Sequence, residues 1–299
     1  MELRHIRYFM AVAEESNFTR AAARVGIGQP PLSQQIRDLE AEIGAPLFHR
    51  VPHGAELTEA GCAFYDIAGG ILADAERAKG AAQRAARGEI GRLRVGFTGS
   101  SAFSPWVPGL IREFRRTYPE VDVDLVELNS QMLMAKMKRD ELDVAVIRPS
   151  LEDPEGLKLC RFPDEPMVIA LPAAHPLTEN PAAPLVALQD EPFVFYPRTI
   201  GLGLYDEVFT VCHRAGFAPR IVQEAPQIAS VVNLVAAEMG VSIVPGPMAQ
   251  VRVAGVAYRR FEGLAPVARH ACAMRRGETS PAVRNFMAMA AATAHKLGV

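Results

Sequence analysis

Four polar side chains between residues 29 and 37 have the chemistry that reads DNA bases. A glutamine amide, as at Gln29 or Gln34, can bond N6 and N7 of adenine together, and an arginine, as at Arg37, can bond O6 and N7 of guanine. Each well-formed pair discriminates between bases by about 1–3 kcal/mol. Gln29, Ser33 and Arg37 are four residues apart, so on a helix they line one outward face. The alternative is that this face is the solvated side of an ordinary surface helix.

The apolar residues around this face predict three short helices. Apolar side chains recur at intervals of three and four residues, which marks one buried stripe on each helix. Gly26 and Gly28 flank the predicted turn before the third helix. That helix is expected to open at Pro30 or Pro31, because proline is well tolerated in the first turn. Two helices joined in this way form a helix-turn-helix, whose second helix enters the DNA major groove. The predicted stripes are Ile6, Phe9, Met10 and Ala13; Phe18, Ala21, Ala22 and Val25; and Leu32, Ile36, Leu39 and Ile43.

The charge of this region does not by itself indicate DNA binding. Residues 1–60 contain six arginines and no lysine against eight acidic residues, and 6 − 8 gives a net charge of about −2. A general basic patch is therefore not expected, and contact with phosphates depends on individually placed arginines. These are Arg4, Arg7, Arg20, Arg37 and Arg50.

Residues 46–61, PLFHRVPHGAELTEAG, add further motifs. The ordered motifs QPPLS, L-E-x-x-I-G, P-L-F-x-R and L-T-x-A-G resemble the N-terminal domain of the LysR-type transcriptional regulators. The resemblance implies a winged helix-turn-helix that binds an operator in double-stranded DNA. For His53 the alternative is an ordinary exposed loop histidine. The DNA contacts that the resemblance implies, on the third helix and the wing, are Gln29, Pro30, Ser33, Gln34, Arg37, Arg50 and His53.

The composition limits the class of protein. A chain of 299 residues with 49% hydrophobic residues and a net charge of −2 suits about two folded domains and is not typical of disorder. It has neither a run of eighteen apolar residues nor a basic-then-apolar leader, so we expect no membrane span and no export signal. The cysteines are scattered, which favours a reducing, cytoplasmic compartment. They are Cys62, Cys160, Cys212 and Cys272.

Residues 58–87 predict one long helix with an alanine-rich second half. Its apolar positions recur at spacings of three and four, and small alanines allow two helices to approach closely. We expect a dimer coiled coil, with a core helix packed in its own domain as the alternative. The resemblance implies a homodimer through this helix, a homotetramer, and RNA polymerase as a further partner. The expected stripe is Phe64, Ile67, Ile71, Ala75, Ala78, Ala82 and Ala85.

From residue 92 onward, predicted strands alternate with helices, which is typical of a parallel α/β sheet. The predicted strands are residues 92–98, 121–128, 142–147, 166–171, 193–197, 220–225, 241–245, 255–261 and 268–275. The predicted helices are residues 106–118, 130–141, 204–216, 227–240 and 281–298.

The fold class expected for the whole chain is α/β. It comprises a winged helix-turn-helix, a long linker helix, and a C-terminal two-lobed domain that resembles the periplasmic binding proteins. The expected domains are residues 1–57 for DNA binding, 58–91 for the linker, dimerisation helix and hinge, and 92–299 for effector binding. Within the last, lobe I covers about 92–161 and 268–299, and lobe II about 162–267.

Ligands of open α/β sheets bind beyond the carboxyl ends of the strands. Serine hydroxyls and helix-start N–H groups there bind carboxylates, and apolar neighbours can cover a ring. We therefore expect an aromatic or unsaturated carboxylate as inducer. The alternatives are simple N-capping for the serines and a surface or inter-subunit salt bridge for Arg148. The expected effector-binding residues are Thr98, Ser100, Ser101, Phe103, Ser130, Arg148, Thr199, Leu202, Leu204 and Ile228.

The segments GFTGSSAFSPWVP, DELDVAV and VSIVPGPM resemble, within the LysR family, the regulators of aromatic-compound catabolism. The sequence contains no P-loop, dinucleotide fingerprint, HExxH or GxSxG motif, so we expect neither an enzyme nor a cofactor. Its histidines do not cluster at metal-ligand spacing. The expected function is an inducer-switched transcriptional regulator. The alternative is a small-solute-binding module without DNA-binding regulation.

Overall fold

The computed structural model describes residues 1–51, 54–150 and 153–298. The chain divides into two compact units, Met1–Arg84 and Ala85–Val299. Each unit has its own hydrophobic core. In the described part of the chain, no helix combines the length and apolar character needed to cross a membrane.

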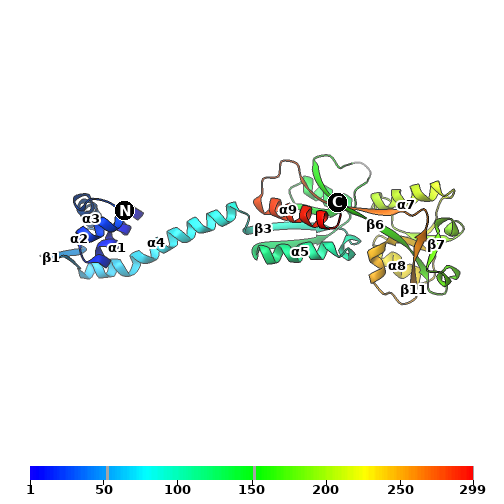
Figure 1. Ribbon diagram of the computed structural model, residues 1–299, viewed down its shortest axis with the longest axis horizontal. Coiled ribbons are helices and arrows are strands. Elements are labelled where there is room, and N and C mark those ends of the chain that lie inside the picture. The colour runs from blue at the N-terminus through cyan, green and yellow to red at the C-terminus, as the bar shows by residue number, and fades with distance from the viewer. Residues whose placement is uncertain (52–53, 151–152, 299) are drawn as a thin grey trace. The chain divides into compact units, whose positions relative to one another are not determined.

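Three helices packed around one core open the N-terminal unit (Figure 1). The predicted stripes supply most of that core, because Phe9, Leu32 and Ile36 are fully buried. Ile43 departs from the prediction and is 39% exposed, because it lies at the end of its helix. The three helices are α1 (Leu3–Glu15), α2 (Phe18–Val25) and α3 (Gln29–Ile43).

The turn between α2 and α3 depends on Gly26. It adopts φ +71°, a left-handed conformation that glycine favours, and its N–H donates to the carbonyl of Ala23. Gly28 has an ordinary φ of −72° and is the N-cap of α3. The helix begins at Gln29, one residue before the predicted start, and Pro30 still lies in the first turn, where a missing N–H costs nothing.

The wing that follows α3 is a two-stranded antiparallel hairpin. Its strands are β1 (Phe48–Val51) and β2 (Gly54–Leu57). The N–H of Ala55 donates to the carbonyl of Ser16 over 2.9 Å, which fixes the wing to the end of α1. The wing and the first helix therefore belong to one packed unit.

The motifs P-L-F-x-R and L-T-x-A-G have a structural role at the start of α4 (Glu59–Ala86). Thr58 Oγ1 donates to the carbonyl of Pro46 over 2.7 Å and accepts from the N–H of Gly61 over 2.9 Å. Glu40 Oε1 accepts from the N–H of Leu47 over 2.8 Å. A Cβ on Gly61 would lie 2.1 Å from the carbonyl oxygen of Leu47, so only glycine fits there. These contacts join α3, the wing and α4.

The predicted long helix is confirmed, with α4 one residue shorter than expected at each end. Its first half packs on the N-terminal core, where Phe64 meets Phe9 edge to face at 4.8 Å and Ala68 is fully buried. The second half extends beyond α1–α3 (cyan in Figure 1). Ile67, on the predicted stripe, is 68% exposed.

The second unit is an α/β structure with one large mixed sheet and one small parallel sheet. Its strands are β3 (Ile90–Phe97), β4 (Glu120–Glu127), β5 (Val144–Ile147), β6 (Leu157–Pro172), β7 (Ala182–Pro184), β8 (Pro192–Phe195), β9 (Arg220–Glu224), β10 (Ser242–Pro245), β11 (Val256–Glu262) and β12 (Val267–Arg275). Its α-helices are α5 (Trp106–Thr117), α6 (Ser130–Lys138), α7 (Leu202–Arg214), α8 (Ile228–Ala236) and α9 (Pro281–Lys296). Its 3-10 turns are η1 (Ser101–Phe103), η2 (Pro176–Glu179), η3 (Leu185–Leu188) and η4 (Gly246–Gln250).

The large sheet has the order β4-β3-β5-β12-β6-β11-β7, with β10 also paired to β6. The predicted parallel pairing is confirmed for β3 with β4 and β5. It is wrong for β12 and β6, which pair antiparallel with each other because they are the strands that pass between the two lobes. The small sheet joins β8 and β9 in parallel.

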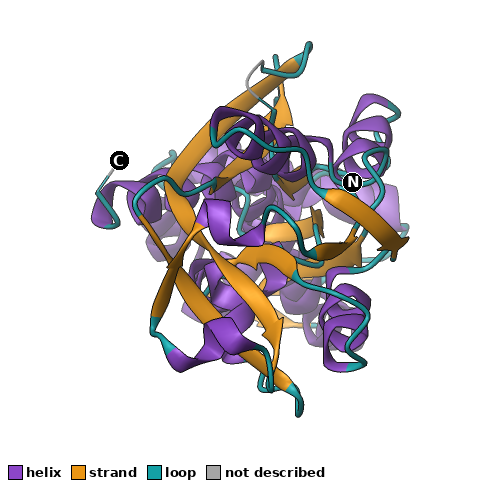
Figure 2. Cartoon of the chain, turned by 90° about the vertical axis from the view of Figure 1, so that its right-hand side faces the viewer, coloured by secondary structure: helices purple, strands orange, loops and turns teal. Residues whose placement is uncertain are grey.

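The strand β6 divides the second unit into two lobes. Its first part, Leu157–Pro166, pairs with β12, and its second part, Met167–Pro172, pairs with β10 and β11. One core lies on the first-lobe strands around Leu93 and Phe286, and another lies around Phe193. Figure 2 shows the long strands (orange) running through the unit between the helices. The prediction missed the first nine residues of β6.

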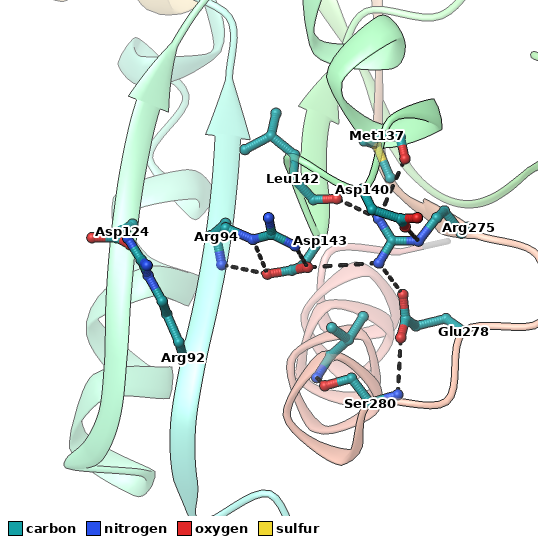
Figure 3. A network of polar contacts seen from close by, with 11 residues as sticks. Arg92, Arg94, Asp124, Met137, Asp140, Leu142, Asp143, Arg275, Glu278 and Ser280 are labelled. Atoms are coloured by element: carbon teal, nitrogen blue, oxygen red, sulfur yellow. Dashed lines mark hydrogen bonds and ion pairs between the residues drawn. The ribbon is translucent and has the colours of Figure 1, made fainter.

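A polar network holds the first-lobe sheet together where β5 begins beside β3 (Figure 3). Asp143 Oδ2 accepts from the N–H of Arg94 at 2.8 Å and from its Nε at 3.0 Å, and Oδ1 accepts from Nη2 at 2.6 Å. Burial raises the pKa of Asp143, but the bonds from Arg94 and the charge of Arg275 outweigh it and hold the pKa below its usual value. Arg275 also bonds to Glu278, just before α9. The motif DELDVAV thus contains a structural aspartate.

Candidate effector cleft and nucleic-acid interface

The helix α3 presents a polar exposed face made of part of the predicted set. Gln29, Pro30, Gln34 and Arg37 are exposed. Arg37 Nη2 donates to Gln34 Oε1 over 2.6 Å. Gln34 in turn donates to Asp38 over 2.8 Å. These bonds hold the amide and the guanidinium side by side on the exposed face of the helix.

Ser33 differs from the expectation of an outward-facing residue. It is only 5% exposed, and its hydroxyl accepts from Gln29 Nε2 at 3.1 Å. The reason is that Ser33 directly follows Leu32 and lies beside the buried stripe of α3. Its role in this conformation is to orient Gln29.

The two predicted wing residues differ in how the structure describes them. Arg50 lies in β1, paired with Ala55 of β2. His53 lies outside the described residues. The wing therefore contributes one described backbone position to the candidate interface.

A cleft of about 560 Å³ lies in the second unit beside the carboxyl ends of the first-lobe strands. This volume is within the range of small-molecule sites. Seven of the ten predicted effector residues line it: Thr98, Ser100, Phe103, Ser130, Arg148, Leu204 and Ile228. The rule that ligands bind beyond strand ends thus selected residues that the structure brings together around one cleft.

Three predicted effector residues do not line this cleft. Ser101 has no exposed surface, because its hydroxyl is turned inward toward Thr98 Oγ1 and His270 Nε2, at 2.5 and 3.1 Å. Thr199 is exposed outside the lining. Leu202 lines a smaller cavity of about 70 Å³, as the first residue of α7.

Arg148 is buried, contrary to the alternative of a surface salt bridge. It is 5% exposed, and its Nη2 bonds to Glu165 Oε2 at 3.0 Å. Its Nε donates to Ser100 Oγ at 2.7 Å, and its backbone N–H donates to Ser130 Oγ at 3.2 Å. One arginine therefore fixes both serines that face the cleft.

Behind this arginine lies a second buried pair, Glu165 and His270. Glu165 Oε1 is 3.3 Å from His270 Nδ1, and the ring stands edge-on to Trp106, with 5.3 Å between the ring centroids. Burial, reinforced by the charge of Arg148, lowers the pKa of His270 to about 4. Burial raises the pKa of Glu165, but His270 and Arg148 outweigh it and lower that pKa to about 2. At neutral pH the histidine is neutral and the glutamate is charged.

The order Ser101, His270, Glu165 superficially matches a hydrolytic triad. The serine hydroxyl is closed off from the cleft, so no substrate can reach it. The three side chains are part of the interior of the unit. Among the described residues, no group of three or more histidine, cysteine or carboxylate side chains is placed to hold a metal ion.

Tyr196 is a cleft residue that the sequence analysis missed. It follows β8, is 3% exposed, and its hydroxyl has no hydrogen-bond partner in the described residues. Burial raises the pKa of Tyr196, so the hydroxyl keeps its proton. The sequence feature that could have identified Tyr196 as a cleft residue is its position at the carboxyl end of a predicted strand. Glu127, Pro226 and Gln227 also line the cleft and were not predicted.

A larger hollow of about 970 Å³ lies over α5 and the edge strand β4. It is lined largely by exposed arginines and by apolar residues of that strand. The smaller cleft is the better ligand site, because buried polar groups such as Ser100 and Tyr196 converge on it.

Comparisons with known proteins agree with both units. Residues 3–62 match the family model described as bacterial regulatory helix-turn-helix protein, lysR family, and residues 86–294 match the LysR substrate binding domain. The chain is 41% identical over 289 residues to the HTH-type transcriptional regulator BudR of Raoultella terrigena, covering 97% of this chain and 100% of the relative. It is 37% identical over 289 residues to the Hca operon transcriptional activator HcaR of Escherichia coli (strain K12), covering 97% of each.

The solved structures include a full-length relative on DNA. The crystal structure of CbnR complexed with its target DNA matches with a TM-score of 0.84 at 28% identity, covering 98% of this chain and 100% of that chain. The exposed face of α3, the wing and the cleft beyond the strand ends therefore occur in a chain that matches this family along nearly its whole length. The protein belongs to the LysR family of DNA-binding transcriptional regulators.

Proposed function

We propose that this regulator is switched by a small carboxylic acid, aromatic or unsaturated, that binds in the cleft of the second unit. The observation that carries the proposal is the convergence of Ser100, Ser130 and Tyr196 on one cleft. The two serine oxygens already accept bonds from Arg148, so each hydroxyl proton is free to donate to a ligand. Three hydroxyl donors beside a buried cation suit a carboxylate.

The apolar wall supports a ring or an unsaturated chain. Phe103, Leu204 and Ile228 also line the cleft, the last two from the second lobe. The likeness of GFTGSSAFSPWVP and VSIVPGPM to regulators of aromatic-compound catabolism supports the same class. The predicted contacts of Ser101, Thr199 and Leu202 are not part of this proposal, because none of them lines the cleft.

The output of the switch is proposed to be operator binding. Gln29, Gln34 and Arg37 would read bases in the major groove, with Pro30 beside them and the wing, through Arg50 and His53, contacting the backbone or the minor groove. Ser33 would act through Gln29. The protein would act in the cytoplasm, as an activator without catalytic activity, with RNA polymerase as a partner.

We propose that residues 1–57 bind DNA, residues 58–91 dimerise and hinge, and residues 92–299 bind the effector. Two copies would pair through α4 and two dimers would form a tetramer. Inducer would then favour one placement of the DNA-binding units over another. It can shift this equilibrium only by its difference in affinity for the two states.

The test uses the full chain and the DNA upstream of its own gene. Fluorescence anisotropy at fixed salt measures DNA binding, and titration calorimetry measures binding of benzoate, cinnamate and muconate. We expect saturable binding of at least one acid and an acid-dependent change in the DNA complex. Saturable DNA binding with no response to any of the acids would exclude the carboxylate inducer and leave the family assignment intact.

A further inference from the structure

The charge in the cleft that has no oppositely charged partner is negative. Arg148 lines it, but its charge is balanced by Glu165 at 3.0 Å. Glu127 also lines it and is exposed. Within residues 1–51, 54–150 and 153–298, no hydrogen bond or ion pair engages the Glu127 carboxylate. A simple carboxylate would thus enter a cleft with an uncompensated carboxylate in its wall.

Glu127 lies next to the loop that is proposed to hold the ligand's carboxylate. It ends β4 and is the pairing partner of Phe97, the last residue of β3. A Cβ on Gly99 would lie 2.6 Å from Glu127 Oε1, so the carboxylate rests directly against that glycine. Ser100, one of the proposed donors, is the next residue along the chain. Donor and acceptor groups of the wall are therefore neighbours.

Tyr196 gives independent evidence that a ligand belongs at this place. Tyr196 lines the same cleft, and its buried hydroxyl lacks a partner in the described chain. A buried unpaired donor is unfavourable, and a ligand oxygen would satisfy it. The cleft thus offers hydroxyl donors for one oxygen-rich group and, beside them, one carboxylate acceptor.

We propose, on the basis of the carboxylate-binding cleft proposed above, that the ligand is an acid with a hydrogen-bond donor on its α-carbon. Its carboxylate binds to the hydroxyls of Ser100, Ser130 and Tyr196. Its α-hydroxyl or α-ammonium group donates to the carboxylate of Glu127. The rest of the ligand packs on the apolar wall, which includes Phe103 and Leu204.

The order of groups in such an acid suits the order of groups in the wall. In a 2-hydroxy or 2-amino acid the donor and the carboxylate are attached to adjacent carbons, and in the wall the Glu127 carboxylate lies against Gly99, the residue next to Ser100. An acid without the donor leaves its carboxylate beside that of Glu127 with no hydrogen bond between the ligand and Glu127. Like charges held close together in a partly dry site repel, so Glu127 selects against plain acids.

Phenylacetate, mandelate and phenylglycine test the proposal, because they differ only in the group on the α-carbon. Titration calorimetry on the full chain is expected to show mandelate and phenylglycine binding at least about tenfold more tightly than phenylacetate. In Glu127→Ala the three affinities should fall within about threefold of one another. In Glu127→Gln the preference for mandelate should persist, since an amide oxygen accepts a hydroxyl proton, and the preference for phenylglycine should be lost with the charge.

Two further variants separate the parts of the site. Asp122→Asn, exposed on β4 outside the cleft lining, is the matched control and should leave all three affinities unchanged. Ser130→Ala removes a proposed carboxylate donor and should weaken all three acids by a similar factor. Circular dichroism on each variant checks that the fold is retained.

The results distinguish failure of the α-donor requirement from failure of the carboxylate cleft itself. If phenylacetate binds as tightly as mandelate and phenylglycine, or if Glu127→Ala keeps the preference, the α-donor requirement is wrong and the carboxylate cleft stands. The same follows if the protein binds benzoate or cinnamate but none of these three. If no acid of either series binds, the carboxylate cleft falls, and the α-donor requirement falls with it.

Discussion

Nη2 of Arg148 lies 3.0 Å from Oε2 of Glu165, and both side chains are almost entirely withdrawn from solvent. Arg148 directly follows the first-lobe strand β5, whereas Glu165 lies on β6 just before that strand enters the second lobe. The pair therefore ties the floor of the cleft to one of the strands that connect the lobes. Arg148 donates hydrogen bonds to both Ser100 and Ser130, so a ligand that bonds to either serine is linked to the arginine through that hydroxyl.

Removing Arg148 should destabilise the second unit strongly. Arg148→Met leaves Glu165 buried without its cation, which costs about 3–5 kcal/mol for pairs of this kind. Urea unfolding followed by the fluorescence of Trp106, the one tryptophan of the sequence, measures this unit. The control is Arg198→Met, since the Arg198–Asp206 pair is exposed to solvent and its loss should leave the unfolding midpoint almost unchanged. Equal costs in the two variants would contradict the structural role of Arg148.

Acid should weaken the second unit through His270. The folded pKa is about 4 against 6.5 in the unfolded chain, so the unfolded state binds the proton first and stability falls as the pH drops from 6.5 to 4. The loss from this residue is at most about 3 kcal/mol. Glu165, with its pKa lowered to about 2, adds a further loss below its usual pKa. His270→Gln should flatten the slope between pH 6.5 and 4, and His213→Gln, exposed on α7, should not.

Asp143 should contribute stability that acid removes. Its folded pKa is lowered, so its contribution is present above the unfolded value and is lost as the pH falls through the folded one. Asp143→Asn should cost about 1.5–3 kcal/mol at neutral pH, the range for bonds to charged groups. Asp124→Asn, in the exposed pair with Arg92, should cost under about 1 kcal/mol. A small effect at Asp143 would show that the network in Figure 3 is not stabilising.

Arg37→Ala should weaken binding to the operator by about 5- to 150-fold, the equivalent of one bidentate base contact. Binding to unrelated DNA should change little. Arg24→Ala is the control, since that guanidinium is held by Glu14 and Glu15. Anisotropy measured on operator and unrelated DNA at the same salt concentration separates sequence-specific binding from non-specific binding to phosphates. Equal loss on both DNAs would mean that Arg37 binds phosphate only.

Ile67→Lys should convert dimers to monomers. The side chain is 68% exposed on the predicted stripe of α4, and a charge there would be buried in the proposed coiled coil. Gln83→Lys adds the same charge off the stripe and should leave the dimer intact. Light scattering coupled to gel filtration gives the mass directly. A dimer that survives Ile67→Lys would place the interface elsewhere.

Periodicity predicted the helices well because each buries one regular stripe. The long helix differs from its predicted bounds by one residue at each end. The first part of β6, in contrast, contains Pro163 and several charged residues, and it becomes a strand because β12 supplies the pairing partner. A tertiary partner of that kind leaves no local pattern in the sequence.

The candidate site was predictable at the level of strand ends but not of side-chain direction. Thr98 and Ser101 are three residues apart in one loop, yet the first lines the cleft and the second faces His270, 169 positions later in the chain. Ser33 turned inward for a similar reason, since its neighbours on α3 are core residues. Tyr196 and Glu127 were missed because neither residue type, taken alone, indicates a ligand.

The pairing of Pro166 with Val267 places the two ends of the second lobe beside each other. The second lobe is therefore an insertion whose two ends lie side by side. Recombination can exchange it as one block without breaking the first-lobe core. Such an exchange would keep Ser100, Ser130 and Glu127, all encoded before the junction, and replace Tyr196, Leu204 and Ile228. The architecture thus allows the anchoring half and the discriminating half of a recognition site to be inherited separately.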